Sequence, residues 1–430
     1  MWKMNFKQAW MLMKQNPLFS GIYVVGTGLS IALVMTVFII YYVKFAPIYP
    51  EYNRNRTLVI TAMKRYPHGK PDNYNMNSGV NYTAVRAMVA DLPHVECVAS
   101  GNGNSYDKKQ VLLPSGRKEE VIPYYGDADM WRVFTFRFLQ GKPFTEADVD
   151  SSIPVAVISR SLARRLYATD DAVGKTFRLG NHDFKVCGVV EDVSNATPQT
   201  AGDLWLPLYF WEWIDEKDAN NLLGSARLFI LVDEERHVDE VRKAVQGGFD
   251  ERNRQDDQYV FDLMGQPDRH WVSTFRSMEE PDMTELLKSI GYVLLALIFI
   301  PALNLSGMIA SRMDRRQGEF GVRKAYGATN RQIVRQVLTE NLLLTSLGAL
   351  LGLLLSYLIV VTASEWILNL FDKEVRTEAQ TVHFSFEMLF NLWVFGCTFL
   401  LCLLLNLLSA LIPTLSALRR TIIQALNTGR

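Results

Sequence analysis

The sequence predicts an α-helical membrane protein with four transmembrane helices and a large extracytoplasmic α+β domain. Four blocks, at residues 18–43, 289–310, 342–362 and 389–412, are apolar and long enough to cross a hydrocarbon core of about 30 Å. The long polar stretch between the first two blocks, residues 44–288, alternates strand-like and helix-like segments. Such a stretch needs a core of its own, so we expect a folded domain on one side of the membrane.

The composition excludes several classes of function. The chain has 45 basic and 45 acidic side chains, and nucleic-acid binding normally needs a basic excess. The predicted spans contain no Asp, Glu, Lys, Arg or His, which ion-coupled carriers and intramembrane enzymes usually place at depth. The sequence shows no nucleophile, zinc-ligand spacing or acid–base motif. We therefore expect a non-catalytic membrane subunit with no cofactor, no metal and no nucleic-acid partner.

The distribution of Lys and Arg sets the orientation. Basic residues gather before the first span, between the second and third spans, and after the fourth. The positive-inside rule then places both termini and the middle connection in the cytoplasm. The first span is expected to be an uncleaved anchor, because its apolar run is too long for a signal peptide. The remaining segments are an interfacial amphipathic helix at 1–17, an extracytoplasmic domain at 44–288, a cytoplasmic segment at 311–341, a short outer loop at 363–388 and a cytoplasmic tail at 413–430.

The extracytoplasmic domain has the same element order at both of its ends. Strand, helix and strand patterns occur within residues 50–105 and again within residues 208–270. We expect the two flanks to form one α+β unit, interrupted by a strand-rich insertion at 106–207. The expected elements are strands at 56–63 and 95–100 around a helix at 83–92 with Thr83 as a possible cap, and strands at 228–232 and 259–264 around a helix at 238–249.

Local motifs within the insertion predict turns and caps. Thr145 and Asp148 have the spacing of a capping box, and Ser159 precedes a short helix as its expected cap. Gly180 sits between two strand-like runs and predicts a hairpin. The tripeptide at Gly174 resembles the end of a phosphate-binding loop, but the preceding glycine of that motif is missing, so a turn is expected there.

Two features of the external domain leave alternatives open. Cys97 and Cys187 allow a disulfide if the domain is outside the cytoplasm, although two free buried thiols are favoured. The aromatic stretch at 205–213 is expected to pack where the insertion meets the flanking unit. The alternative is an exposed patch for a partner, centred on Trp211 and Trp213.

Residues 317–355 change from a basic, helix-patterned half to an almost purely apolar half. We interpret this stretch as a short surface helix that leads into the third span. Within that span, Gly348, Gly352 and Ser356 recur at intervals of four and allow two helix backbones to approach closely. Packing within the subunit and packing across a dimer are equally compatible with this stripe.

Three passages resemble a known family, the MacB/FtsX-like permeases of ABC transporters, also called type VII or mechanotransmission permeases. RRQGEFGVRKAYGATNRQIVRQVLTE, at 315–340, is similar to the family signature Glu-Ile-Gly-x-Arg-x-Ala-x-Gly-Ala. FKQAWMLMKQNPLFSGIYVVGTGLSIALV resembles its elbow helix and first span, and GKPFTEADVD with the following strands resembles its periplasmic core domain. In that family a strand-rich insert interrupts a porter-like subdomain, and an FtsX-like permease domain would here cover about 289–425.

The resemblance implies that a separate cytoplasmic ATPase dimer, holding ATP and Mg, docks on the connection between spans two and three. The residues that match this coupling segment are Glu319, Gly321, Arg323, Lys324, Tyr326, Gly327 and Ala328, with the two glycines expected to shape a docking turn. ATP-driven closure of the ATPase would push this segment, and the third span would transmit the movement outward.

The resemblance also implies a setting. The chain would work in a bacterial inner membrane with a second permease copy or a paralogue. A periplasmic adaptor and an outer-membrane channel are further partners. The implied function is export or extraction of a periplasmic or membrane substrate. An alternative is a signalling scaffold that activates a periplasmic partner such as a cell-wall hydrolase.

Overall fold

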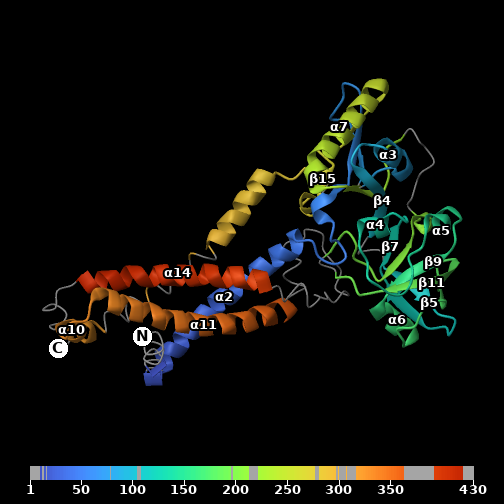
Figure 1. Cartoon of the computed structure of the whole chain (residues 1–430). Coiled ribbons are helices and arrows are strands. Elements are labelled where there is room, and N and C mark those ends of the chain that lie inside the picture. The colour runs from blue at the N-terminus through green and yellow to red at the C-terminus, as the bar shows by residue number, and fades with distance from the viewer. Residues whose placement is uncertain are drawn as a thin grey trace. The chain divides into compact units, whose positions relative to one another are not determined.

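The computed structural model describes most of the chain as two compact units (Figure 1). The described residues are 10–11, 14–15, 17–77, 79–103, 108–194, 197–212, 221–276, 280–296, 299, 307, 316–362 and 392–419. The helical unit comprises Met1–Tyr42, Asp282–Ser364 and Phe386–Arg430, and the α+β unit comprises Val43–Pro281 and Glu365–Ser385. Most of the predicted helix at 1–17 and all of the predicted loop at 363–388 lie outside the described residues.

The helical unit contains two described helices that are long and apolar enough to cross a membrane, Ser20–Phe45 and Asn330–Thr362. They contain the first and third predicted spans. Of the second predicted span only part is described, and the described part of the fourth belongs to a helix with a shorter apolar segment, Phe395–Leu405. Four spans therefore stay a prediction. The named helices are α2 (Pro17–Phe45), α10 (Gln317–Ala325), α11 (Asn330–Thr362) and α14 (Leu392–Arg419), with α11 beside α14 (Figure 1).

The α+β unit is built on a long sheet with the strand order β15-β1-β13-β4-β7-β12-β9-β11-β10-β5-β6, and β8 pairs with β11. Its strands are β1 (Thr57–Ile60), β4 (Val95–Gly103), β5 (Lys109–Leu112), β6 (Lys118–Val121), β7 (Pro123–Gly126), β8 (Phe138–Gly141), β9 (Val155–Ser159), β10 (Thr176–Leu179), β11 (His182–Val190), β12 (Leu204–Pro207), β13 (Arg227–Val232) and β15 (Asp268–Arg269). A second, smaller sheet has the order β14-β2-β3, formed by β14 (Tyr259–Asp262), β2 (Met63–Pro67) and β3 (Asn75–Asn77).

The two flanks of the domain do combine into one α+β unit. Strand β13 from the second flank lies between β1 and β4 from the first, with Ile230 opposite both Leu58 and Val98. These three side chains are buried in a core that helices α3 (Tyr82–Val89) and α7 (Val238–Gln255) complete. The insertion is not a separate sheet, because its strand β7 pairs directly with β4. The α+β class is therefore confirmed, with one sheet shared by both parts.

Two expected strands differ from the structure. The strand expected at 56–63 is broken after Ile60, and its last residues enter the second sheet as β2. The side chain of Gln266 replaces the strand partners at this break. Its Oε1 accepts a hydrogen bond from the Thr61 N–H, and its Nε2 donates to the Ala62 carbonyl, both at 2.7 Å. Strand β14 pairs with β2 and not with the main sheet.

The caps and turns of the insertion mostly agree with the sequence. Thr145 and Asp148 form the reciprocal capping box of α5 (Glu146–Asp150), and Ser159 caps α6 (Arg160–Tyr167). The turns at Gly174 and Gly180 both have positive φ, of 85° and 60°. The cap of α3 was placed wrongly at Thr83. The described cap is Asn81, whose side chain accepts a hydrogen bond from the backbone N–H of Ala84 at 3.2 Å.

The described residues 283–296 are also helical, and the remaining named helices are short. They are α4 (Met130–Val133), α8 (His270–Ser273) and the 3₁₀ turns η1 (Arg54–Arg56), η2 (Leu208–Phe210) and η3 (Glu235–His237). Cys97 and Cys187 are both free thiols, and burial raises the pKa of each, to about 12 and about 11. The favoured interpretation of these cysteines, without a disulfide, is therefore the one that the structure has.

Candidate functional site

Helix α10 is fixed to α11 by five polar side chains, which we call the coupling cluster: Arg316, Glu319, Arg323, Gln336 and Glu340. The Arg316 guanidinium donates to Glu340 at 2.8 Å and to Glu319 at 2.9 Å. Arg323 forms an ion pair with Glu319 at 2.6 Å and donates a hydrogen bond to Gln336. Gln336 and Glu340 are one turn apart on α11 and both are buried. The cluster thus joins both ends of α10 to one face of α11.

An apolar contact reinforces the coupling cluster on the inner face of α10. Phe320 is buried together with Ile333 and Val337 of α11 and Tyr23 of α2. The Arg316 guanidinium lies 5.4 Å from the centroid of the Phe320 ring, a cation–π contact. Removing Phe320 would therefore disturb both the apolar packing and the placement of Arg316.

The outer face of α10 and the residue that follows the helix carry large exposed apolar side chains. Val322 is 47% exposed and Tyr326 is 89% exposed, and the two are four residues apart on one side of the chain. Scattered exposed apolar residues are ordinary, but two neighbouring ones on a short, firmly held helix form a surface suited to a partner. Arg323 lies between them in sequence but is engaged in the coupling cluster. The outer face, which we call the docking face, is therefore chemically distinct from the inner one.

The turn after α10 depends on one glycine. Gly327 has φ of +86°, and the backbone N–H of Ala328 reaches the Arg323 carbonyl at 3.0 Å to close the helix. Gly321, which was also expected in this turn, lies inside α10 and is buried. The expectation of a turn at Gly321 is wrong, because the backbone there stays helical. Lys324 is partly exposed at the end of the helix.

The Gly348, Gly352 and Ser356 stripe packs against α2 of the same chain. A Cβ atom on Gly348 would lie 2.9 Å from the Cβ of Thr27, and one on Gly352 would lie 2.9 Å from the Cβ of Ile31. Real Cβ atoms do not approach so closely, so the two helices could not keep this spacing with larger residues. The stripe is thus a packing face within the subunit, and α2 covers it.

The end of α2 is fastened by three buried ionisable side chains, which we call the base cluster: Glu51, Arg54 and His270. The Arg54 guanidinium donates to the carbonyls of Val43 and Ala46, at 2.6 and 2.8 Å, which lie at and just beyond the C-terminal end of α2. It also forms an ion pair with Glu51 at 2.8 Å. His270 Nε2 lies 3.0 Å from the same Glu51 carboxylate. All three side chains are at most 3% exposed.

Burial and charge together set the protonation states of the base cluster. Burial alone would raise the pKa of Glu51, but the positive charge of Arg54 and the contact with His270 lower it to about 2. Burial lowers the pKa of His270 below its usual range, against the opposing pull of Glu51. At neutral pH the cluster therefore holds one carboxylate, one guanidinium and one neutral imidazole.

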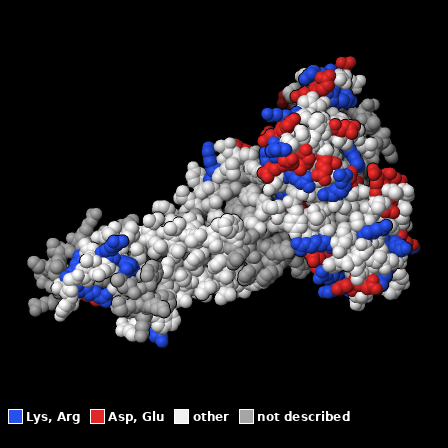
Figure 2. Space-filling model, in the orientation of Figure 1, with Lys and Arg blue, Asp and Glu red and all other residues white. Residues whose placement is uncertain are grey.

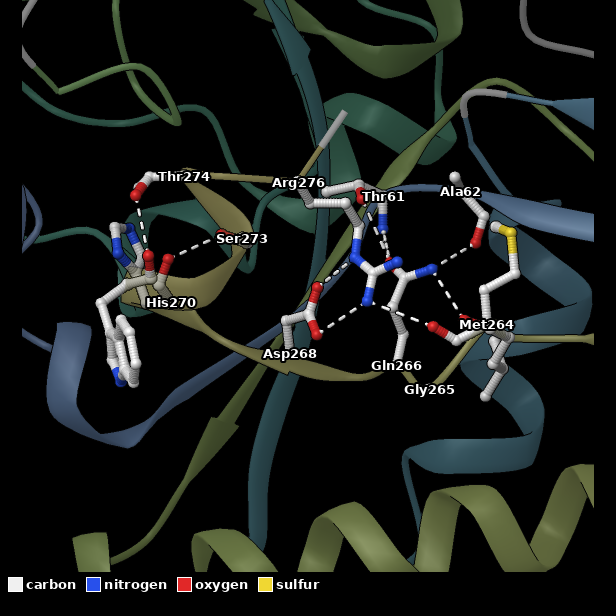
Figure 3. A network of polar contacts seen from close by, with 12 residues as sticks. Thr61, Ala62, Met264, Gly265, Gln266, Asp268, His270, Ser273, Thr274 and Arg276 are labelled. Carbon is white, nitrogen blue, oxygen red and sulfur yellow. Dashed lines mark hydrogen bonds and ion pairs between the residues drawn. The ribbon is translucent and has the colours of Figure 1, made fainter. Parts of the chain in front are cut away.

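The C-terminal segment of the α+β domain is held at the edge of the main sheet that β15 forms (Figure 3). Asp268 and Arg276 form a buried ion pair, and Arg276 also donates to the Met264 carbonyl at 3.2 Å. Strand β15, which contains Asp268, pairs with β1 and so joins this segment to the main sheet. The rings of Trp271 and Phe275 each lie 5.9 Å from that of Phe45, the last residue of α2.

Sequence reasoning missed the base cluster entirely. Glu51 and His270 lie at opposite ends of the domain in the sequence. Each looks like an ordinary polar residue on the surface of such a domain. The only local signal was the pair Glu51 and Arg54, placed a few residues beyond an apolar block. Nothing in the sequence indicated that His270 would reach them.

The proposed partner patch at Trp211 and Trp213 is not supported. Trp211 is 9% exposed and stacks on Tyr125 with ring centroids 6.3 Å apart, inside the core of the insertion. Trp213 lies outside the described residues. Packing, the favoured interpretation, holds for the described tryptophan.

The two units differ in how many charged side chains their surfaces carry. Figure 2 shows acidic and basic side chains interleaved over the α+β unit, while the visible face of α11 and α14 is mostly uncharged. Long apolar helices in one unit and a large charged domain in the other are features of a membrane protein.

Family comparison agrees with this class. The family model described as "MacB-like periplasmic core domain" matches residues 20–247, and the one described as "FtsX-like permease C-terminal" matches residues 291–422. The chain belongs to the MacB/FtsX family of ABC transporter permeases.

Individual relatives are more distant. The ABC transporter permease YvrN of Bacillus subtilis is 28% identical over 244 residues, which cover 54% of this chain and 56% of YvrN. The macrolide export ATP-binding/permease protein MacB of Pasteurella multocida is 26% identical over 236 residues, 55% of this chain and 34% of that protein. The chain thus spans about half the length of YvrN and about a third of the length of MacB. The periplasmic region of MacB from Actinobacillus actinomycetemcomitans matches with a TM-score of 0.32 and 16% identity, covering 47% of this chain and 88% of that region.

Proposed function

We propose that this chain is a permease subunit that couples ATP hydrolysis by a separate cytoplasmic ATPase dimer to motion of its α+β unit in the periplasm. The observation that carries the proposal is the two-sided chemistry of α10. Its inner face is held by Phe320 and the coupling cluster, whereas Val322 and Tyr326 on the docking face stand in water. A helix that is rigidly held on one side and open on the other is suited to receive a push.

The contacts of α11 support a route for that push. The coupling cluster ties α10 to α11, which continues without a break through 33 residues. Within α11 the small residues at Gly348 and Gly352 hold α2 at close range, and interiors packed this tightly transmit displacement instead of absorbing it. Near the C-terminal end of α2, the Val43 carbonyl accepts a hydrogen bond from Arg54. Motion of α10 would therefore be passed on through α11 and α2.

The names of the relatives support the wider setting. Pyoverdine export ATP-binding/permease protein PvdT of Pseudomonas syringae is 24% identical over 307 residues, covering 68% of this chain and 42% of that protein. Its name and that of MacB combine a permease with ATP binding. For this chain we propose export or extraction of a periplasmic or membrane substrate, in a bacterial inner membrane with both termini inside. ATP and Mg would be bound by the partner ATPase, and a second permease copy or paralogue would complete the dimer.

Affinity purification from the native membrane tests the proposal. The full chain, solubilised in mild detergent, should recover an ABC ATPase in near-equal amount. Replacing Tyr326 by Asp should reduce that recovery, while Tyr209→Asp, at an exposed tyrosine of the α+β unit, should leave it unchanged. Absence of any ATPase with the unaltered chain would refute the proposal. Recovery of a periplasmic hydrolase, with no compound lost from export on deletion, would favour a signalling scaffold.

A further inference from the structure

Two histidines and an aspartate meet at one end of the main sheet. His94 Nδ1 lies 2.9 Å from one carboxylate oxygen of Asp233, and His237 Nδ1 lies 2.8 Å from the other. The two imidazole rings stack with centroids 3.7 Å apart and an angle of 31° between their planes. One ligand atom from each side chain can be chosen so that all three lie within 4.8 Å of one another.

The backbone holds these side chains in place before any ligand arrives. The Asp233 N–H donates to the His94 carbonyl at 3.0 Å, which joins the turn before β4 to the turn after β13. Arg56 donates to the Asp233 carbonyl at 3.3 Å. His94 itself has φ of +67°, a left-handed conformation that costs a residue with a Cβ some free energy. A strained backbone conformation persists only where the surrounding structure enforces it, and such conformations cluster at ligand-binding sites.

The cluster is also open to solvent. The side chains of His94, Asp233 and His237 are 33%, 42% and 19% exposed, so an ion could enter and keep a water ligand. The Asp233 carboxylate faces both imidazoles, one through each of its oxygens. Two imidazoles, one carboxylate and a water are a donor set that suits zinc and its neighbours in the transition series.

We propose that His94, Asp233 and His237 form a binding site for a divalent transition-metal ion such as Zn²⁺. Metal–ligand bonds of about 2.0–2.1 Å in a tetrahedral site separate neighbouring ligand atoms by roughly 3.3 Å. The nitrogen–oxygen distances of 2.8 and 2.9 Å involve different oxygens of Asp233, so the three side chains would rearrange locally to place one oxygen and both nitrogens around the ion.

Binding requires a proton to move on His237. Arg236 Nε lies 3.2 Å from His237 Nε2, so this nitrogen accepts and Nδ1 carries the proton that faces Asp233. When the metal binds both Nδ1 atoms, this proton and the one on His94 Nδ1, which also faces Asp233, each transfer to Nε2 of the same ring through solvent, and the Arg236 contact is released. Arg236 is 70% exposed and can leave without disturbing the core.

The position of the site suggests what the ion would do. His94 comes from the first flank of the domain, and Asp233 and His237 come from the second. These flanks are separated in sequence by the whole insertion and are joined here by the β4–β13 pairing. A metal ion would cross-link them at the end of that pair, and it would stabilise the folded domain by its binding free energy.

Zinc titration of the purified full chain tests the site. The protein in detergent is stripped with EDTA, exchanged into clean buffer and titrated with ZnCl₂ against a chromophoric chelator. We expect one ion per chain at this site and a rise in the unfolding temperature with zinc. His94→Ala and His237→Ala should each weaken binding at least about tenfold and abolish that rise.

Two further variants keep the result interpretable. His94→Gln preserves hydrogen bonding to Asp233 but removes the imidazole, so a folded variant should still lose the ion. His182→Ala alters an exposed histidine at a hairpin far from the cluster in sequence and should bind as the unaltered chain does. Failure to bind zinc, or binding that neither His94 nor His237 substitution weakens, would overturn the proposal. ATPase recovery does not enter this readout, so its outcome is independent of the proposed function.

Discussion

The coupling cluster and the base cluster use the same chemistry but differ in their exposure. Both combine arginines with a buried glutamate, Glu340 in one and Glu51 in the other. The base cluster is closed, since its three side chains are at most 3% exposed. The coupling cluster is closed toward α11 and open toward water, where Arg323 and Glu319 are about one third exposed. The first arrangement suits a fixed joint, and the second suits a joint that a partner can reach.

The largest expected effect comes from breaking the closed joint. Arg54→Met leaves Glu51 as a buried carboxylate and frees two backbone carbonyls at the end of α2. Removing one partner of a buried ion pair costs about 3–5 kcal/mol, so the unfolding midpoint in denaturant should fall sharply. Arg254→Met is the matched control, because its ion pair with Glu251 is 72% and 55% exposed and should contribute under about 1 kcal/mol. Equal effects of both changes would contradict a structural joint at Arg54.

A charge exchange separates the two faces of α10. Arg323→Glu places two carboxylates side by side and should reduce ATPase recovery roughly tenfold, equivalent to about 1.4 kcal/mol. Adding Glu319→Arg recreates the ion pair in reverse. Rescue by the double variant would show that Arg323 acts by positioning α10. Lack of rescue, with the helical unit folded, would mean that Arg323 itself contacts the partner or that the Glu319–Arg316 ion pair, which the second substitution removes, is also required.

The close approach of α2 and α11 gives a smaller effect. Gly352→Ala adds a Cβ that would lie 2.8 Å from the Gly28 carbonyl oxygen, so the helices must separate. Overpacking of this kind costs about 1–3 kcal/mol, and the unfolding temperature should drop. Gly21→Ala meets nothing within 4 Å and should be neutral or slightly stabilising. A neutral Gly352→Ala would argue against packing along this stripe.

The smallest effect is a pH dependence of the base cluster. His270 has a lowered pKa in the folded state, so the unfolded chain binds the proton more readily. Its contribution to stability is complete above about pH 6.5, the ordinary value, and declines as the pH falls below it. Glu51 adds a second loss only at lower pH, between its usual range and about 2. His270→Gln should flatten the unfolding midpoint between pH 6.5 and 5, and an unchanged slope would point to another group.

Local chemistry was predictable where it depends on neighbours in sequence. The capping box at Thr145 and the cap at Ser159 involve partners three residues away, so their spacing carried the information. The joining of the two flanks was also predictable, because both repeat one element order. By contrast, the break after Ile60 depends on Gln266, 205 residues from Thr61. No periodicity in a strand can register a partner so distant.

The candidate site was predictable only in outline. The charge pattern and the family signature located α10, but they did not say which of its side chains face inward. Arg323 and Glu319 looked like contacts for a partner and are engaged with α11 or with each other. Tyr326, which fills an unspecified position of the signature directly after α10, is 89% exposed. The orientation of a short helix depends on what it packs against, and that was not visible in its own sequence.

Photocrosslinking at Tyr326 tests the central claim most directly. A photoreactive phenylalanine derivative replaces Tyr326, and the cells are irradiated before the membranes are solubilised. We expect a crosslink from position 326 to an ABC ATPase, strengthened when ATP turnover is blocked. The same substitution at Tyr209, which is 62% exposed on the α+β unit, should give no such product. An ATPase that copurifies with the chain but crosslinks from neither Tyr326 nor its neighbour Val322 would contradict a docking face on α10.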